Sequence, residues 1–362
     1  MNQFYAAFIP GLQNVIARVI KERLKDAVIH KLLDGAVIFE TETSYDKLNF
    51  FCFNNIFAIV NVREENHAKT QRREGRREDV LLKNIRCFIE ENKNYDIISN
   101  NSKNFKTFRI VISNENQPAA IDEKLRVEAE KYISRISGLK VNRSLPDTEF
   151  WFLYRRDDDT KNNFTIFMKR LTLRPSWEKT LHKGELPPPL TWVLCRLADI
   201  KHNDTVLDPF CGYGSIPNTA MKYFHITNFF ASDNNKEAAS YTASRFKKKD
   251  TGNFIIHKAD FEKLPAIIKE KSIDVIITDP PWGHFKEVDN TVFLKQIFEI
   301  FGKLLKDGGR AVVLYANDDN FLKAQPSCFE LQESIPILLS GKKAIIYILE
   351  KSSHGGTETR RC

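Results

Sequence analysis

The residues with the clearest chemical potential are T-D-P-P-W-G, from Thr278 to Gly283, directly after the apolar run Ile273 to Ile277. The run predicts a strand, and two successive prolines cannot continue a sheet ladder, so the strand must end there. Proline has no N–H group, which leaves the acceptors of the turn free for a ligand. The turn therefore combines a carboxylate, carbonyl groups and the aromatic plate of Trp282, a set that suits an amino nitrogen on a flat molecule.

A second candidate is the stretch D-P-F-C-G-Y-G-S, from Asp208 to Ser215, between the predicted strand 205–207 and the small-residue helix 216–221. Gly212 and Gly214 allow a ligand to approach the backbone closely, and the start of a helix offers free N–H groups. The third glycine of a dinucleotide fingerprint is missing, and no G-K-[ST] follows as in a phosphate loop. The context predicts a cofactor cradle, with a tight structural turn as the alternative.

Acidic residues follow the next two predicted strands. Asp233 could accept hydrogen bonds from two ribose hydroxyl groups, or it could cap the following helix. Asp260, beside Phe261, could bind an adenine amino group while the ring lies against the base, or it could be an ordinary turn residue. Because the carboxyl ends of parallel strands share one edge of a sheet, we expect these acids to lie in the same crevice as Asp279.

The elements that must position these residues alternate between strand and helix from Pro175 onward. This alternation predicts a Rossmann-like, doubly wound α/β domain with a seven-stranded, mostly parallel sheet. The last two strands have no helix between them and are predicted to form an antiparallel hairpin at the sheet edge. The predicted strands are 205–207, 228–231, 253–257, 274–278, 310–315, 329–335 and 343–350, with helices at 191–198 and 291–305 among others.

The front half predicts two α+β units separated by a charged stretch. The first has strands at 3–8, 36–40 and 57–62 and helices at 12–24 and 45–53. The stretch 64–79 carries five Lys or Arg and five acids, a net charge of zero, which favours a solvated linker or insert over a basic RNA-binding arm. In the second unit we predict helices 80–90 and 121–136 and strands 105–113, 151–154 and 164–168.

The composition restricts the class of protein only loosely. A net charge of +8 is compatible with a polyanionic partner and equally with none. The six cysteines form no C-x-x-C pair and no zinc-type spacing, so no metal site is expected. Without a secretory signal or a long apolar run, we expect a cytoplasmic protein that does not enter a membrane.

The glycine turn, Asp233, Asp260 and D-P-P-W together resemble the ordered motifs of class I S-adenosylmethionine-dependent amino-methyltransferases. The run from Leu207 to Pro217 is similar to the L-D-P-F-C-G-[ST]-G-T-I of THUMP-containing RNA methyltransferases. In the front half, 8–12 resembles the opening of their ferredoxin-like domain and 108–171 resembles their THUMP domain. The resemblance fails over 64–79 and the tail, and the departures within its motifs are Gln13, Tyr213, Ser215 and Trp282.

The resemblance implies S-adenosylmethionine as the cofactor and RNA, with tRNA favoured, as the partner. The implied reaction is methylation of an exocyclic base amine, with guanine N2 favoured. An adenine-N6 methyltransferase and a non-catalytic RNA-binding protein with this fold are the alternatives. The implied catalytic residues are Asp279, Pro280, Pro281 and Trp282, and the implied cofactor-binding residues are Asp208, Phe210, Cys211, Gly212, Gly214, Ser215, Asp233, Asn234, Asp260 and Phe261.

The sequence leaves two alternative roles for several further residues. Cys211 could act as a nucleophile, as a cysteine does in 5-methylcytosine enzymes, but its place in the cofactor turn favours a packing role. His284 could contact substrate or be an exposed loop residue, and Arg170, Arg174, His182 and Lys183 could meet phosphates or be solvated linker charges. We expect a monomer, with no indication of an activating subunit, divided into a ferredoxin-like domain (1–63), a linker or insert (64–79), a THUMP domain (80–172), a linker (173–189), the methyltransferase domain (190–351) and a disordered tail (352–362).

Overall fold

The computed structural model describes residues 1–45, 47–48, 50–65, 76–91, 95–99, 104–115, 117–156, 163–172, 181–246, 253–282, 290–316 and 320–353. The chain forms two compact units. One consists of Met1–Phe8 and Gln13–Pro175, and the other of Ile9–Leu12 and Ser176–Cys362. Most of the predicted charged stretch and of the predicted tail, together with Arg174 and His284, lies outside the described residues.

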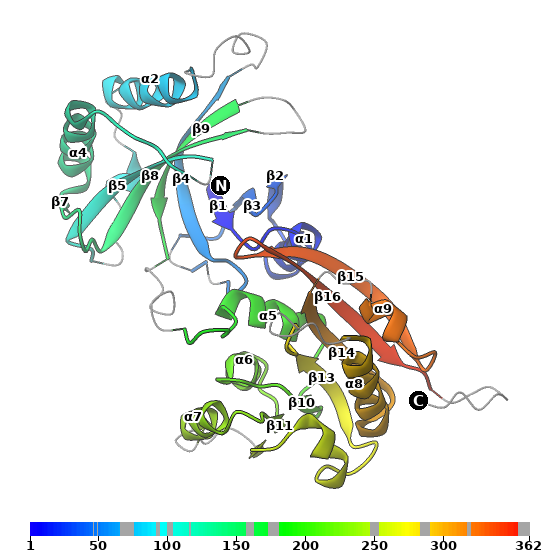
Figure 1. The fold of residues 1–362 in the computed structure, drawn as a ribbon. Coiled ribbons are helices and arrows are strands. Elements are labelled where there is room, and N and C mark those ends of the chain that lie inside the picture. Colours follow the sequence, from blue (N-terminus) through cyan, green and yellow to red (C-terminus); the bar gives the residue numbers. More distant parts are fainter. Residues whose placement is uncertain are drawn as a thin grey trace. The chain divides into compact units, whose positions relative to one another are not determined.

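The first unit is built on one mixed sheet with the strand order β2-β3-β1-β4-β9-β8-β5-β6, and β7 pairs with β5 (Figure 1). Antiparallel pairing of β4 with β9 joins the two predicted front domains into this single sheet. Its strands are β1 (Asn2–Ala7), β2 (Val28–Leu33), β3 (Ala36–Thr41), β4 (Asn55–Glu65), β5 (Thr107–Asn114), β6 (Gln117–Pro118), β7 (Lys140–Val141), β8 (Thr148–Arg156) and β9 (Asn163–Arg170), and its helices are α1 (Gln13–Arg23), α2 (Arg76–Glu90), α3 (Asp96–Ser99) and α4 (Glu123–Ser137).

One local prediction for the first unit was wrong, and one strand was missed. The predicted helix 45–53 is not formed, because the residues described there adopt turns and bends. Phe50 and Phe53 are nevertheless buried, with ring centroids 5.2 Å apart, so a loop that packs into the core imitated a helical pattern. The strand β2 was not predicted, although it forms a hairpin with β3 through Gly35 at φ +75°.

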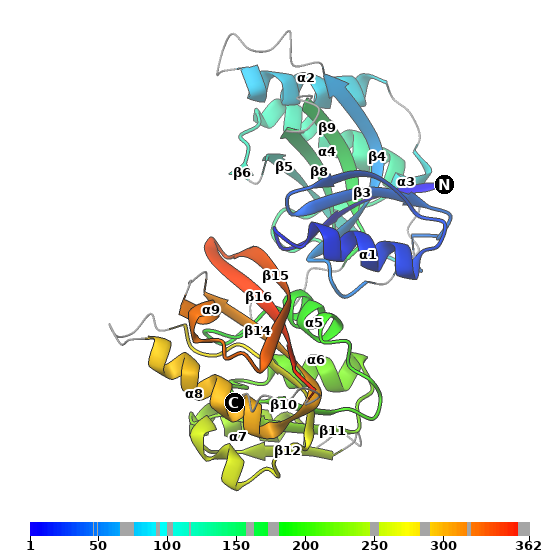
Figure 2. The same ribbon diagram turned by 90° about the vertical axis from the view of Figure 1, so that its right-hand side faces the viewer.

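The second unit contains the predicted seven-stranded sheet, in the order β12-β11-β10-β13-β14-β16-β15. The first five strands in this order are parallel, and the antiparallel β15–β16 hairpin forms the edge beyond β14 (Figure 2). Its strands are β10 (Thr205–Asp208), β11 (Asn228–Ser232), β12 (Asn253–His257), β13 (Ile273–Thr278), β14 (Leu305–Ala316), β15 (Phe329–Leu339) and β16 (Lys342–Lys351), and its helices are α5 (Pro188–Leu197), α6 (Ser215–Tyr223), α7 (Lys236–Phe246), the 3₁₀ helix η3 (Phe261–Ala266), α8 (Asn290–Leu304) and α9 (Asn320–Ala324).

The core of this unit fixes the central strands. In β13, Val275, Ile276 and Ile277 are fully buried, as expected for a strand covered on both faces. Leu207 and Ile276 are register partners in the adjacent strands β10 and β13. The carboxyl ends of these strands therefore bring the glycine turn and the D-P-P-W turn to the same edge of a rigid sheet.

Candidate active site

The centre of the site is a buried carboxyl group at the end of β10. Asp208 is 1% exposed, and its Oδ1 accepts hydrogen bonds from Thr278 Oγ1 at 2.8 Å and from the N–H of Phe210 at 3.2 Å. Its Oδ2 is buried and has no hydrogen-bond partner among the described residues. Burial raises the pKa of Asp208 to about 8, and the charges of Asp233 and Asp279 add to the rise.

The glycine turn is closed by Asp233 from the end of β11. The N–H of Gly212 donates to Asp233 Oδ2 at 2.7 Å, and the N–H of Asn235 donates to Oδ1 at 2.8 Å. Asn235 Oδ1 in turn accepts from the N–H groups of Glu237 and Ala238, so Asn235 caps α7. Asp233 therefore ties the turn to the helix start, and the cap is Asn235, two residues beyond Asp233, for which capping was one of two alternatives.

The backbone of the glycine turn is shaped for close approach. Gly212 has φ +50°, and a Cβ added there would meet no atom within 4 Å. Gly214 has φ +84°, and its Cβ would lie 2.7 Å from Cγ2 of Thr242. Gly212 thus borders open space, whereas Gly214 packs against α7, and both conformations favour glycine.

An aromatic cluster lies beside the end of β12. The ring of Phe261 is 5.0 Å from that of Phe210 and 5.5 Å from that of Phe293, measured between centroids. Phe293 comes from α8 and carries no sequence signal of its own. Asp260 is exposed and stands at the start of η3, where its side chain makes no capping hydrogen bond. Asp260 and Phe261 thus lie together after β12, with an acceptor facing solvent.

The D-P-P-W turn follows β13 as predicted, and a side chain of the turn binds the carboxylate of the same turn. Trp282 Nε1 donates to Asp279 Oδ1 at 2.8 Å, and the indole packs partly buried against the core. Burial of the carboxyl group raises the pKa of Asp279 to about 7, against the lowering effect of that hydrogen bond. Pro280 is buried and Pro281 is exposed.

Cys211 has the environment of a packing residue. It is 5% exposed, and its N–H donates to the carbonyl of Ser232 at 2.9 Å. Burial and the neighbouring carboxylates of Asp208 and Asp233 raise the pKa of its thiol, which disfavours the thiolate that a nucleophile needs.

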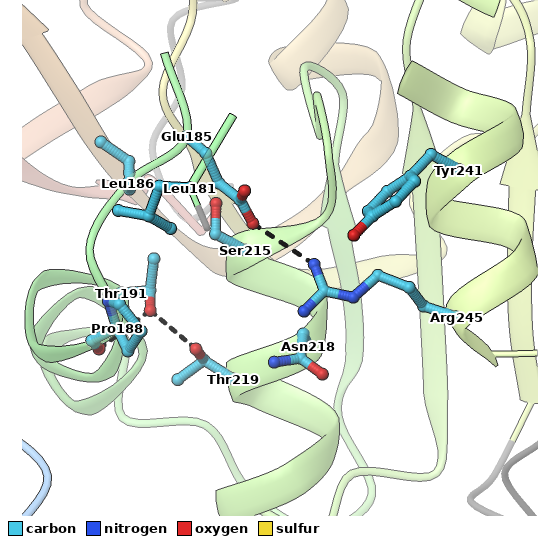
Figure 3. Close-up of a pocket in the computed structure, with 10 residues that line it drawn as sticks. All are labelled: Leu181, Glu185, Leu186, Pro188, Thr191, Ser215, Asn218, Thr219, Tyr241 and Arg245. Carbon is cyan, nitrogen blue, oxygen red and sulfur yellow. Dashed lines mark hydrogen bonds and ion pairs between the residues drawn. The ribbon is translucent and has the colours of Figure 1, made fainter. Parts of the chain in front are cut away.

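A pocket of about 140 Å³ adjoins the glycine turn, between the segment before α5 and the helices α6 and α7 (Figure 3). Thr191 and Thr219 share a hydrogen bond of 2.7 Å between their hydroxyl groups on one wall. On another wall, Arg245 and Glu185 form an ion pair of 3.3 Å. Ser215, the first residue of α6, also lines this pocket and so connects it to the turn.

Two of the basic candidates are engaged elsewhere. The ring of His182 stacks on that of Tyr213 with centroids 3.9 Å apart. Arg170 is 6% exposed and pairs with Glu149 at 2.9 Å in the first unit. Both positions favour structural roles over contact with phosphate.

Neither a metal centre nor a membrane span is found in the described ranges. Their His, Cys, Asp and Glu side chains form no group of three or more that could hold a metal ion. Their helices include none that is both long and apolar enough to cross a membrane.

These features fit an adenosyl cofactor. Three features lie at the carboxyl edge of the parallel strands. They are the open space above Gly212, the buried Oδ2 of Asp208, which has no partner among the described residues, and the acids after the second and third strands. The D-P-P-W turn stands at the end of the fourth strand of the same sheet, and the fold is that of a class I methyltransferase.

The comparison with protein families agrees. Residues 175–333 match the family described as the RMKL-like methyltransferase domain. This match lies over the predicted methyltransferase domain, and the predicted fold class and enzyme class are confirmed.

Curated relatives show similarity beyond this domain. The chain is 26% identical over 262 residues, 66% of its length and 70% of the relative's, to the tRNA (guanine(10)-N2)-dimethyltransferase of Methanocaldococcus jannaschii. It is 24% identical to the tRNA (guanine(6)-N2)-methyltransferase of Thermus thermophilus, over 68% of this chain and 72% of that one. A human U6 snRNA (guanine-N(2))-methyltransferase is 28% identical over half of this chain, which spans only 34% of that relative.

Solved structures support the fold over nearly the whole chain. The crystal structure of TrmN from Thermus thermophilus aligns with a TM-score of 0.72 at 19% identity, covering 97% of this chain and 100% of that one. A putative methyltransferase, SMU.472, complexed with S-adenosylhomocysteine (SAH), aligns with a TM-score of 0.62 at 12% identity, covering 98% of this chain and 99% of that one.

Proposed function

We propose that the protein transfers a methyl group from S-adenosylmethionine to the exocyclic N2 of a guanine in RNA, with tRNA as the substrate. The carrying observation is the placement of Asp279 at the end of β13, beside β10 and its glycine turn. This brings an acceptor for an amino group next to the proposed cofactor cradle. The names of the relatives, which specify guanine N2, support the choice of base.

The cofactor would be held by residues along the sheet edge. Bound there, S-adenosylmethionine supplies an electrophilic methyl group on a sulfonium. The ribose hydroxyls are assigned to Asp233, and the adenine to Asp260 with Phe261. The ring of Phe210 packs against that of Phe261. Cys211 and Ser215 would shape the glycine turn, and Asn234 is exposed beside Asp233.

The D-P-P-W turn would activate the amine. An exocyclic amine is a weak nucleophile because its lone pair is delocalised into the ring. Hydrogen bonds from the amine to the Asp279 carboxylate and the Pro280 carbonyl would favour a tetrahedral nitrogen and free that lone pair. Trp282 would stack on the base, a contact of about 1–3 kcal/mol. Alignment of amine and methyl donor can supply roughly 7–11 kcal/mol more.

The remaining proposals concern setting and partners. We infer a cytoplasmic protein that binds structured RNA through its first unit and is a monomer. Size-exclusion chromatography with light scattering, with and without tRNA, tests this: a stable dimer in the absence of RNA would contradict it.

Calorimetry and mass spectrometry together test the function. Purified protein should bind S-adenosylmethionine, and tRNA from a strain lacking the gene should gain N2-methylguanosine on incubation with both. Asp279→Ala should bind the cofactor as wild type does and transfer no methyl group. If the product is N6-methyladenosine, the protein is an adenine-N6 methyltransferase and the proposed base is wrong. If the protein does not bind the cofactor, the alternative of a non-catalytic RNA-binding protein is favoured.

A further inference from the structure

One face of α7 holds the glycine turn from behind. Thr242 Oγ1 donates to the carbonyl of Gly212 at 2.9 Å, and Arg245 Nη1 donates to the carbonyl of Tyr213 at 3.0 Å. Gly214 packs directly on the Thr242 side chain. Two successive carbonyl groups of the turn are thus fixed by two side chains one helical turn apart.

The segment before α5 completes this arrangement. Glu185 Oε1 accepts from Arg245 Nη1 at 3.3 Å, and Glu185 Oε2 accepts from the N–H of His182 at 3.1 Å. The Glu185 side chain is 7% exposed and that of Arg245 is 31% exposed, so the carboxylate is the buried partner of the pair. Figure 3 shows this carboxylate directed at the guanidinium. Glu185 therefore fixes the direction in which Arg245 presents its donor.

The side chain of Tyr213 also contributes contacts around the turn. Its ring stacks on His182 and lies 5.6 Å from the ring of Tyr241 in an edge-to-face arrangement. A small residue at this position would leave the turn without these contacts. The departure from the family pattern at Tyr213 thus belongs to the same set of contacts that holds the turn.

We propose that Thr242 and Arg245 are positioning residues that preset the glycine turn for the cofactor, with Glu185 orienting Arg245. They contact the back of the turn and so act on cofactor affinity, not on the amine. The proposal rests on the proposed function, because the ligand of the turn is S-adenosylmethionine. It assigns a role to α7 and to the segment before α5 that the motif residues alone do not provide.

The physical reason is preorganisation. Gly212 and Gly214 have positive φ angles and no side chains, so the free turn has many alternative conformations. When a ligand binds only one conformation of the protein, its apparent Kd equals the intrinsic Kd divided by the fraction of molecules in that conformation. Loss of one of the two hydrogen bonds that fix the carbonyl groups lowers this fraction, and a tenfold decrease would raise Kd by about tenfold.

Calorimetric titration of SAH into four variants of the full chain tests the proposal. Thr242→Val keeps the shape but removes the hydroxyl donor, and Arg245→Met keeps length but removes the guanidinium. Each should raise the Kd by about tenfold, in line with the lost hydrogen bond. Thr242→Ser and Arg245→Lys keep a donor and should recover most of the affinity.

Two further readouts separate positioning from a general structural role. At saturating S-adenosylmethionine, Thr242→Val and Arg245→Met should keep the wild-type kcat while the KM for the cofactor rises. Thr191→Val is the control in the same pocket, because it removes the hydrogen bonds of a buried threonine hydroxyl to Pro188 and Thr219 and none to the turn. It should lower the unfolding midpoint and leave the Kd unchanged.

The outcomes distinguish the two proposals. If wild-type protein does not bind SAH, the proposed function fails. If wild-type protein binds and both donor-free variants bind equally well, only the positioning role is overturned. An equal rise in Kd for Thr191→Val would also overturn it, because the effect would then come from the packing of the pocket.

Discussion

The indole N–H of Trp282 donates to Asp279 Oδ1 at 2.8 Å, so the proposed acceptor of the substrate amine is oriented by a residue of its own turn. A tyrosine or phenylalanine ring, commoner at this position in the resembling family, has no N–H donor. The hydrogen bond also opposes the rise in the pKa of Asp279 that burial causes. Trp282 therefore links the position of the carboxylate to its protonation.

Trp282→Phe should reduce kcat by roughly tenfold, because it removes a hydrogen bond to a charged group but keeps a ring for stacking. The pKa of Asp279 should rise further, since the lost hydrogen bond lowers it. The ionised carboxylate is the stronger acceptor, so the acid limb of the kcat/KM profile should move to higher pH. Methyl transfer measured across pH 5 to 9 with saturating cofactor checks this.

Trp282→Leu is the comparison for the Phe variant. This substitution removes both the N–H donor and the aromatic ring, so the variant should have a higher KM for RNA and lower activity than Trp282→Phe. Equal activity of wild type and Trp282→Phe at every pH would show that the indole N–H has no role in orienting Asp279.

Asp208 should make the second unit less stable as the pH rises. Its pKa is raised from 3.8 to about 8, so between these values the folded state retains a proton that the unfolded state releases. The stability contribution is present at acid pH and decreases with rising pH, by at most about 1.4 kcal/mol per pH unit. Urea unfolding followed from pH 5 to 9 measures the slope.

Asp208→Asn is the matched variant, because the amide is neutral at every pH and still offers an oxygen to Thr278 Oγ1. It should flatten the slope relative to wild type and be the more stable protein above pH 8. Asp279 contributes a slope of the same sign, so some dependence should remain in this variant. An unchanged slope would show that Asp208 is ionised in the folded protein.

The two glycines of the turn should respond differently to alanine. Both have positive φ, so each substitution costs about 1–2 kcal/mol in backbone strain. Gly214→Ala adds a contact of 2.7 Å with Thr242 and should lower the unfolding midpoint more. Gly212→Ala directs its methyl group into open space and should chiefly weaken cofactor binding. Thermal unfolding and calorimetry together test this division, and equal midpoints would contradict it.

The mostly parallel, seven-stranded sheet of the second unit and its antiparallel edge hairpin were predictable, because alternation of strand and helix restricts a sheet to few topologies. The shared position of Asp208, Asp233 and Asp279 followed from the same alternation, since they lie at or directly after the ends of adjacent parallel strands. The contacts of Thr242 and Arg245 with the turn were not predictable, because they depend on the rotation of α7 about its axis.

The first unit was less predictable for a similar reason. Pairing of β4 with β9 joins residues such as Phe57 and Arg170, which lie far apart in the sequence. No local pattern reports such a partner, and periodicity alone cannot tell a buried loop such as 45–53 from a helix. Tertiary packing decided both features.

Cys211→Ala should retain methyl transfer. The thiol is buried, its pKa is raised, and it lies in the turn assigned to the cofactor, so it serves packing and not attack on a base. Loss of one sulfur should cost about 1 kcal/mol of stability and leave kcat within about twofold of wild type. Activity assays and urea unfolding measure both, with Asp279→Ala as the inactive reference. A loss of activity as large as that of Asp279→Ala, with cofactor binding intact, would instead indicate a covalent step through the thiol.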